Sequence, residues 1–347
     1  MTTTVKAYAV PAANAPLEPT TIERRSVREH DVLIEIKYCG VCRSDIHQAH
    51  GDWPGGTFPM VPGHEITGIV TEIGSSVTRY KVGDRVGIGC FVDSCRECEH
   101  CLAGEEQFCL KGQTGTYNAV GRDGELTYGG YSTHIVADEN YVLRIPEGIA
   151  LDEAAPLLCA GITLYSPLKL WGAGPGKKVA IVGLGGLGHM GVKIAHALGA
   201  EVTVLSHSEG KQEDAKRLGA DHFHSTSDDS VFEVLEGTFD LIVNTTSADL
   251  PLGAYLSALR VGGTMVNVSA PPHAVALHLF ALIARRKRLV GSMMGGIRET
   301  QEMLDFCAAH GFGAEIELIS AGQINEAFDR VLKSDVRYRF VIDASTI

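Results

Sequence analysis

A glycine-rich turn between a strand and a helix constrains the fold of this chain most strongly. The continuous apolar run Lys178–Val182 is typical of a strand that is covered on both faces. The pattern G-x-G-x-x-G follows directly, with Gly183, Gly185 and Gly188 at its glycine positions. A helix is expected over 187–198, where a glycine ends it. This order of elements predicts an α/β domain.

Strand and helix segments continue to alternate beyond residue 200, which predicts a doubly wound parallel sheet with right-handed crossovers. The expected segments are strands at 201–205, 239–243 and 264–268 and a helix at 211–218. Helical spacing of apolar residues also runs over 151–170, ahead of the glycine-rich turn.

The rest of the chain has a different character. Up to about residue 150 it consists of short strands punctuated by glycine, such as Val32–Lys37, which is typical of a barrel or sandwich. The last 55 or so residues are mixed, with helices expected at 298–310 and 324–332 and a strand ending at Ile342. Two domains are therefore expected.

Composition excludes several classes of function. The 347 residues are 45% hydrophobic and 21% charged, as in a globular protein, and they contain no apolar run of about 18 residues that would predict a membrane span. A net charge of −12 argues against nucleic-acid binding. Residues 1–6 lead straight into a strand without a secretory leader, and the nine cysteines are an odd number. We therefore expect a reducing, cytoplasmic setting, where clustered thiols bind metal more often than they form disulfides.

The glycine-rich turn is the candidate site for a dinucleotide. Its glycines allow a tight turn, close approach of the backbone to a pyrophosphate and close helix packing. Gly186 and Leu187 lead into the helix, whose first N–H groups would face the phosphates. The alternative is a tight structural turn in a glycine-rich chain.

The segment after the second strand indicates which dinucleotide binds. NAD-binding chains carry an acidic residue here, whereas this chain has Ser206, His207 and Ser208, with Lys211 nearby. Glu209 is the only acid within reach, and it lies past the end of the expected strand. Hydroxyls and a cation suit the 2′-phosphate of NADP, which a carboxylate would repel. The alternative interpretation is a solvated loop with a helix-capping serine.

Four cysteines in one short segment predict a metal site. Cys95, Cys98, Cys101 and Cys109 can close a tetrahedral shell around a structural zinc. An iron–sulfur cluster is the competing interpretation, but its motif places the last cysteine after three residues and before proline. Here seven residues intervene and Leu110 follows, so zinc is favoured.

A second metal site is dispersed along the chain. Cys42, His64 and Cys159 would each be an ordinary buried residue when taken singly. Two thiols and an imidazole in a chain with a dinucleotide site match an open catalytic zinc site, whose remaining position holds water or a substrate oxygen.

These motifs together resemble the zinc-containing medium-chain alcohol dehydrogenases. Gly63-His64-Glu65 with Gly68, Gly74 and Val77 looks like that family's zinc signature, and the four-cysteine segment looks like its structural-zinc lobe. The segment Cys159–Thr163, followed by Tyr165-Ser166-Pro167-Leu168, resembles the cinnamyl alcohol dehydrogenase branch, and its bacterial NADP-dependent aldehyde reductases look most similar.

The resemblance implies a GroES-like β-barrel catalytic domain around an inserted Rossmann domain. The expected domains are 1–150 with 292–347, including the zinc lobe at 90–112, and 151–291 for NADP(H). It also implies two Zn²⁺ per chain and a homodimer, formed by edge-to-edge extension of the Rossmann sheet near Leu289–Met293.

Roles for the residues around the catalytic zinc also follow from the resemblance. Cys42, His64 and Cys159 would be the zinc ligands, and Glu65 would be an alternative ligand. Asp45 would orient His64, as imidazole ligands usually require.

Further roles concern the proton and the cofactor. Ser44 would accept the proton of the alcohol and His47 would pass it to solvent. Thr163 would lie near the nicotinamide, and Arg43 and Arg339 would contact the pyrophosphate.

The expected function is hydride transfer between NADP(H) and an alcohol/aldehyde pair. Gly115 precedes Thr116-Tyr117-Asn118, where the resemblance places a Trp in plant members, so we expect a wide pocket for aromatic and medium-chain aldehydes. Two alternatives stay open: an NAD-dependent polyol or sugar dehydrogenase, and a non-enzymatic NADP-binding redox sensor. No nucleic-acid or membrane partner is expected.

Overall fold

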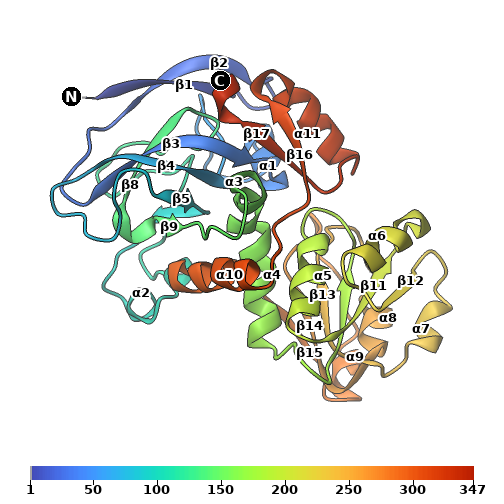
Figure 1. Cartoon of the computed structure of the whole chain (residues 1–347). Helices are drawn as coiled ribbons and strands as arrows, with labels where there is room; N and C mark the ends of the chain where they lie inside the picture. The colour runs from blue at the N-terminus through green and yellow to red at the C-terminus, as the bar shows by residue number, and fades with distance from the viewer. Residues whose placement is uncertain (1) are drawn as a thin grey trace. The chain divides into compact units, whose positions relative to one another are not determined.

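The computed structural model describes residues 2–347, so that Met1 lies outside the described residues. The chain divides into two compact units, Met1–Cys159 with Gly295–Ile347, and Ala160–Met294 (Figure 1). The first is called the barrel unit and the second the Rossmann unit. The sequence-based domain boundaries, at 150/151 and 291/292, stay a prediction.

The barrel unit is built on a seven-stranded sheet in which β3 is central. β3 pairs antiparallel with β4, β8 and β17, and the sheet follows the order β16-β17-β3-β4-β5-β9. The strands are β3 (Asp31–Gly40), β4 (Ile66–Ile73), β5 (Arg85–Ile88), β8 (His134–Asp138), β9 (Leu143–Arg144), β16 (Ile316–Ser320) and β17 (Arg339–Asp343).

Shorter elements complete the barrel unit. Two further strand pairs are β1 (Thr3–Ala9) with β2 (Glu18–Arg24), and β6 (Phe91–Asp93) with β7 (Thr114–Gly115). The α-helices are α1 (Arg43–His50), α2 (Glu99–Ala103), α3 (Leu151–Ala154), α10 (Ile297–Ala309) and α11 (Ile324–Leu332). None of the helices formed by residues 2–347 has the length and apolar character needed to cross a membrane.

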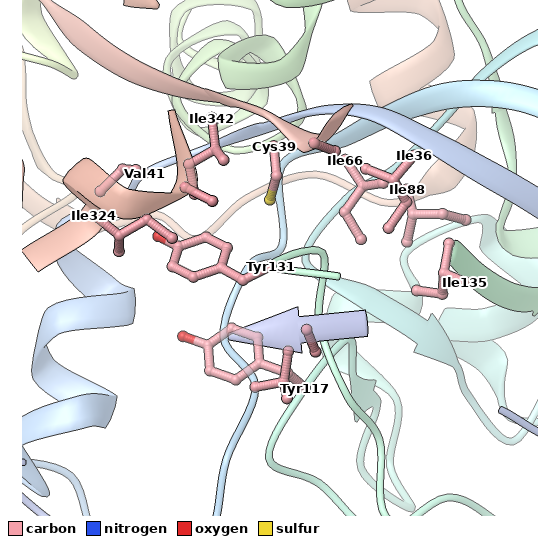
Figure 2. Packing of buried hydrophobic residues seen from close by; sticks show 14 of the residues in the cluster. Ile36, Cys39, Val41, Ile66, Ile88, Tyr117, Tyr131, Ile135, Ile324 and Ile342 are labelled. Atoms are coloured by element: carbon pink, nitrogen blue, oxygen red, sulfur yellow. The ribbon is translucent and has the colours of Figure 1, made fainter. Parts of the chain in front are cut away.

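The C-terminal strand β17 is part of the barrel core although it lies far along the chain. Ile342 of β17 stands opposite Cys39 of β3, and both are fully buried. Figure 2 shows Ile342 in the same apolar cluster as Ile66 and Ile324, which come from β4 and α11. Packing of residues 316–343 against the N-terminal strands therefore completes this hydrophobic core.

The Rossmann unit contains a six-stranded parallel sheet in the order β12-β11-β10-β13-β14-β15. The strands are β10 (Lys178–Val182), β11 (Glu201–Ser206), β12 (His222–Ser225), β13 (Phe239–Asn244), β14 (Leu259–Asn267) and β15 (Arg288–Gly291). The helices are α4 (Ala160–Leu170), α5 (Gly188–Ala197), α6 (Gln212–Arg217), α7 (Val231–Val234), α8 (Leu252–Ser257) and α9 (Phe280–Ile283). The order reverses between β10 and β13, where doubly wound sheets bind ligands at the carboxyl ends of their strands.

The helical spacing over 151–170 does not form one continuous helix. After α3, residues Ala155–Leu158 form a 3-10 turn that contains Pro156, and α4 begins at Ala160. Proline removes a backbone donor, and Cys159 has φ −128° and ψ −66°, outside the helical range. The break leaves Cys159 between two helical segments.

We predict that β17 contributes strongly to the stability of the barrel unit. Phe340→Ala removes a fully buried ring and is expected to lower the free energy of unfolding by about 3–5 kcal/mol, measured by chemical denaturation. Leu318→Ala on neighbouring β16 is the control, because Leu318 is 52% exposed and its truncation is expected to cost less than about 0.5 kcal/mol. Equal effects of the two substitutions would contradict the prediction.

Candidate functional site

The four predicted cysteines of the structural-zinc segment lie together. Their sulfurs all fall within 4.8 Å of one another, and Cys101 Sγ is 3.8 Å from Cys95 Sγ and 3.5 Å from Cys98 Sγ. Backbone N–H groups point at two of the sulfurs: Cys95 donates to Cys109 Sγ at 3.3 Å and Cys98 donates to Cys95 Sγ at 3.4 Å. Backbone hydrogen bonds from Cys101 and Leu110 lower the pKa of Cys98 to about 6. Such a group of thiols suits a closed tetrahedral metal site.

The dispersed residues Cys42, His64 and Cys159 also come together, and Glu65 joins them. One ligand atom from each of the four residues lies within 4.8 Å of the others, and the two sulfurs are 3.9 Å apart. Cys42 follows β3 and is the N-cap of α1, His64 and Glu65 precede β4, and Cys159 occupies the break before α4. Two thiols, an imidazole and a carboxylate are a donor set that fits Zn²⁺.

The two thiols of this group differ in acidity. The hydrogen bond from Cys159 lowers the pKa of Cys42 well below its ordinary value, and the charges of Arg339 and His64 act in the same direction. The same hydrogen bond raises the pKa of Cys159. The structure therefore stabilises a thiolate, the form that binds metal, at Cys42.

Asp45 holds His64 in a defined orientation. Its Oδ1 lies 3.1 Å from His64 Nδ1 and accepts a hydrogen bond from the Gly63 N–H at 3.2 Å, and its Oδ2 accepts one from the Cys42 N–H at 2.9 Å. Burial disfavours the charged imidazole, but Asp45 raises the pKa of His64 well above its ordinary value. An Nδ1–H that donates to Asp45 leaves the His64 Nε2 lone pair for a metal.

Glu65 and Arg339 form a buried ion pair that the sequence analysis did not predict. Arg339 donates to Glu65 Oε1, and the two side chains are 6% and 0% exposed. Burial raises the pKa of Glu65, while the guanidinium of Arg339 opposes that rise. Glu65 Oε2 has no hydrogen-bond partner in the described part of the chain, so one carboxylate oxygen is left over beside the thiols.

The predicted proton-transfer residues lie on α1. Ser44 Oγ lies 3.6 Å from Cys42 Sγ. His47 Nδ1 lies 2.7 Å from Asp52 Oδ2, its ring stacks on Trp53 with centroids 5.4 Å apart, and a third of the side chain is exposed. No hydrogen bond joins Ser44 to His47 among residues 2–347, so the relay stays a prediction. Arg43, at the start of α1, is exposed.

The glycine-rich turn has the geometry that close backbone approach requires. Gly183 has φ +87° and donates its N–H to the Leu205 carbonyl at 2.8 Å. A Cβ on Gly188 would collide with the Gly183 carbonyl, whereas one on Gly185 would meet only open space. Gly186 and Leu187 lead into α5, and Leu187 is its N-cap. The first glycine thus makes the turn, the last packs the helix, and the space at Gly185 is where a ligand could approach.

The residues predicted to bind a 2′-phosphate flank this turn. Ser206 is the last residue of β11 and accepts a hydrogen bond from the Ser208 N–H at 3.3 Å, while His207 is exposed. Lys211 Nζ donates to the Leu184 carbonyl inside the turn at 2.7 Å. Thr163 is half-buried on α4.

Sequence reasoning missed two neighbours of the metal-ligand group. The Cys90 thiol shares a hydrogen bond with Cys159, and the Tyr117 ring stacks on His64 with centroids 5.8 Å apart. The spacing of cysteines in the sequence does not mark Cys90 as part of this site, because Cys90 precedes a segment whose four cysteines already complete a metal site. Tyr117 was noted only through its place beside Gly115 in the expected pocket wall.

Comparison with known proteins extends over nearly the whole chain. Residues 28–147 match the family described as alcohol dehydrogenase GroES-like domain, and residues 186–309 match the family described as zinc-binding dehydrogenase. The chain is 60% identical to the NADP-dependent alcohol dehydrogenase C 1 of Mycolicibacterium smegmatis, with 99% of each chain covered. It is 52% identical to the aldehyde reductase YahK of Escherichia coli, again with 99% of each covered.

A solved structure agrees with these relatives. The cinnamyl alcohol dehydrogenase SbCAD4 of Sorghum bicolor superimposes with a TM-score of 0.95 at 43% identity, covering 99% of this chain and 98% of its own. The predicted fold class, a GroES-like domain with a Rossmann-type parallel sheet, is confirmed. By sequence and by fold, the chain belongs to the zinc-binding alcohol dehydrogenases, and the predicted resemblance to the cinnamyl alcohol dehydrogenase branch is confirmed.

Proposed function

We propose that this alcohol dehydrogenase transfers hydride between NADP(H) and an alcohol/aldehyde pair, chiefly reducing aromatic and medium-chain aldehydes. The observation that carries the proposal is the group formed by Cys42, His64, Glu65 and Cys159, in a chain that also has a dinucleotide-type glycine turn. Relatives named as an NADP-dependent alcohol dehydrogenase and an aldehyde reductase support this reaction.

Cys42, His64 and Cys159 would hold the catalytic zinc, which supplies a Lewis acid for the oxygen of an alcohol or aldehyde. Asp45 keeps the imidazole oriented, and Arg339 balances the charge of Glu65 while leaving one of its oxygens unpaired. This free oxygen supports the proposal that Glu65 is an alternative ligand.

Ser44 and His47 would move the proton that the alcohol loses. Ser44 lies beside the sulfur of Cys42, one of the proposed metal ligands. His47 is partly exposed and its Nδ1 is held by Asp52, so that its other nitrogen is able to exchange a proton with solvent.

NADP(H) is the proposed cofactor. Ser206 and Ser208 offer hydroxyls at the end of β11, and Lys211 places a cation at the glycine-rich turn. Arg43 is proposed to contact the pyrophosphate, with Thr163 near the nicotinamide. We propose the same pyrophosphate contact for Arg339, whose guanidinium already pairs with Glu65.

We also propose a homodimer and a cytoplasmic setting. β15 is one of the two edge strands of the six-stranded sheet, and Met293 just beyond it is 48% exposed, which supports pairing of two copies near Leu289–Met293. The nine cysteines are all free thiols, and two clusters of them need to stay reduced to bind metal, which supports a reducing compartment.

Initial-rate measurements test the proposed reaction. We expect benzaldehyde, cinnamaldehyde and hexanal to be reduced faster with NADPH than with NADH, and sorbitol to be a poor substrate. Cys42→Ala is expected to lower kcat by more than about 100-fold, because it removes a ligand of the Lewis acid, while NADPH binding is retained. The control is Cys307→Ala, a buried thiol outside both cysteine groups.

Two results would contradict this function. A preference for sorbitol with NAD would favour a polyol dehydrogenase. NADPH binding without turnover of any aldehyde or alcohol would favour a redox sensor.

Metal content tests the assignment of the two cysteine groups. The wild-type chain is expected to hold two zinc ions, and Cys101→Ser is expected to hold one, because three remaining thiols no longer close the shell. Metal analysis of the dialysed protein gives the count, with Cys307→Ala as a control that keeps both ions. A Cys101→Ser protein that retains two ions would disprove the four-cysteine site.

A single substitution tests the cofactor preference. Ser206→Asp is expected to raise the KM for NADPH by at least about tenfold and to lower that for NADH, because a carboxylate repels a 2′-phosphate and accepts a hydrogen bond from a ribose 2′-hydroxyl. Ser230→Asp, an exposed serine at the start of α7, adds the same charge elsewhere in this unit and serves as control. An unchanged preference would show that Ser206 does not face the 2′ position.

A further inference from the structure

Tyr131 is a polar side chain within the apolar core of the barrel unit. It is 0% exposed, and its ring packs edge-to-face on Phe328 with centroids 6.4 Å apart. Figure 2 shows the ring among Cys39, Val41 and Ile324. A buried tyrosine hydroxyl needs a hydrogen-bond partner, because an unpaired hydroxyl makes the folded state less stable than a phenylalanine at the same position would. The Tyr131 hydroxyl therefore needs a hydrogen-bond acceptor within this core.

The acceptor of the Tyr131 hydroxyl is Asp45. Tyr131 Oη donates to Asp45 Oδ2 across 3.3 Å, and Asp45 is also 0% exposed. The same oxygen accepts the backbone N–H of Cys42, and Oδ1 faces Gly63 and His64. Each of these hydrogen bonds stabilises the buried carboxylate, because the burial of a charge is costly unless donors surround it.

The ring of Tyr131 also contacts the loop that carries His64. Gly63 has φ +107°, and a Cβ added to it would lie 2.7 Å from Tyr131 Cδ1. The backbone N–H of Tyr131 donates to the Pro62 carbonyl at 3.0 Å, and the Gly130 N–H donates to the Gly63 carbonyl at 2.9 Å. Tyr131 thus contacts both the loop before His64 and the carboxylate that orients its ring.

We propose that Tyr131 is a positioning residue of the catalytic metal site. Its hydroxyl fixes the Asp45 carboxylate, Asp45 fixes the His64 imidazole, and the tyrosine ring fixes the backbone of the loop at Gly63. The proposal rests on the proposed function of Cys42, His64 and Cys159 as zinc ligands, and it adds a residue that controls how firmly they hold the ion.

Tyr131→Phe tests the proposal because it removes only the hydroxyl. We expect the zinc ion at Cys42, His64 and Cys159 to pass to a chelator about tenfold faster than in the wild type. Tenfold is the lower end of the loss in metal affinity or activity when a hydrogen-bond partner of a metal ligand is removed. The release is followed with a colorimetric chelator beside the loss of activity, and the second ion, in the four-cysteine site, is expected to leave at the wild-type rate.

Tyr80→Phe is the matched control. Its hydroxyl donates to the Val142 carbonyl at 2.6 Å in the same unit, and Tyr80 shows no contact with Asp45 among the described hydrogen bonds. This control is expected to release zinc as the wild type does.

A double-mutant cycle separates positioning from general stability. In an Asp45→Asn background, Tyr131→Phe is expected to cause less than a twofold further change in zinc release, because the hydroxyl acts through the carboxylate. Equal release from Tyr131→Phe and Tyr80→Phe, faster release of both ions together, or a full tenfold effect in the Asp45→Asn background would each overturn the proposal. A wild-type chain that binds only one zinc ion would instead remove the proposed function on which it rests.

Discussion

The hydrogen bonds of the buried Asp45 carboxylate are the interaction on which the candidate site depends. One oxygen faces Gly63 and His64, and the other accepts the Cys42 N–H, so a single side chain joins the start of α1 to the loop before β4. The sheet alone brings these segments near each other, because β3 and β4 pair along their length. Asp45 then fixes the relative position of a thiol and an imidazole, which tetrahedral coordination of a metal ion requires.

Charge in this region is balanced by residues from distant parts of the chain. Arg339, at the start of the C-terminal strand β17, pairs with Glu65 and also favours the thiolate of Cys42. The buried Cys42 thiolate and the buried Glu65 carboxylate would be costly without this guanidinium. The packing of β17 into the barrel core therefore has an electrostatic consequence for the site as well as a structural one.

The sequence predicted those features that rest on local spacing. The four cysteines at 95–109 and the glycines at 183–188 lie in short segments, so spacing alone brought them to attention. The Glu65–Arg339 pair joins residues 274 positions apart, and no local pattern indicates it. The spacing of apolar residues did not reveal the break of the helix at Cys159, because that spacing continues through Pro156. The hydroxyl of Tyr131 was missed since a buried tyrosine and a buried phenylalanine give the same hydrophobic signal.

Anomalous X-ray scattering at the zinc edge, from crystals of the protein as purified, tests the central claim most directly. The account predicts two peaks per chain, one of them about 2.3 Å from the sulfurs of Cys42 and Cys159 and about 2.0–2.1 Å from His64 Nε2. A single peak, confined to the four-cysteine segment, would contradict it.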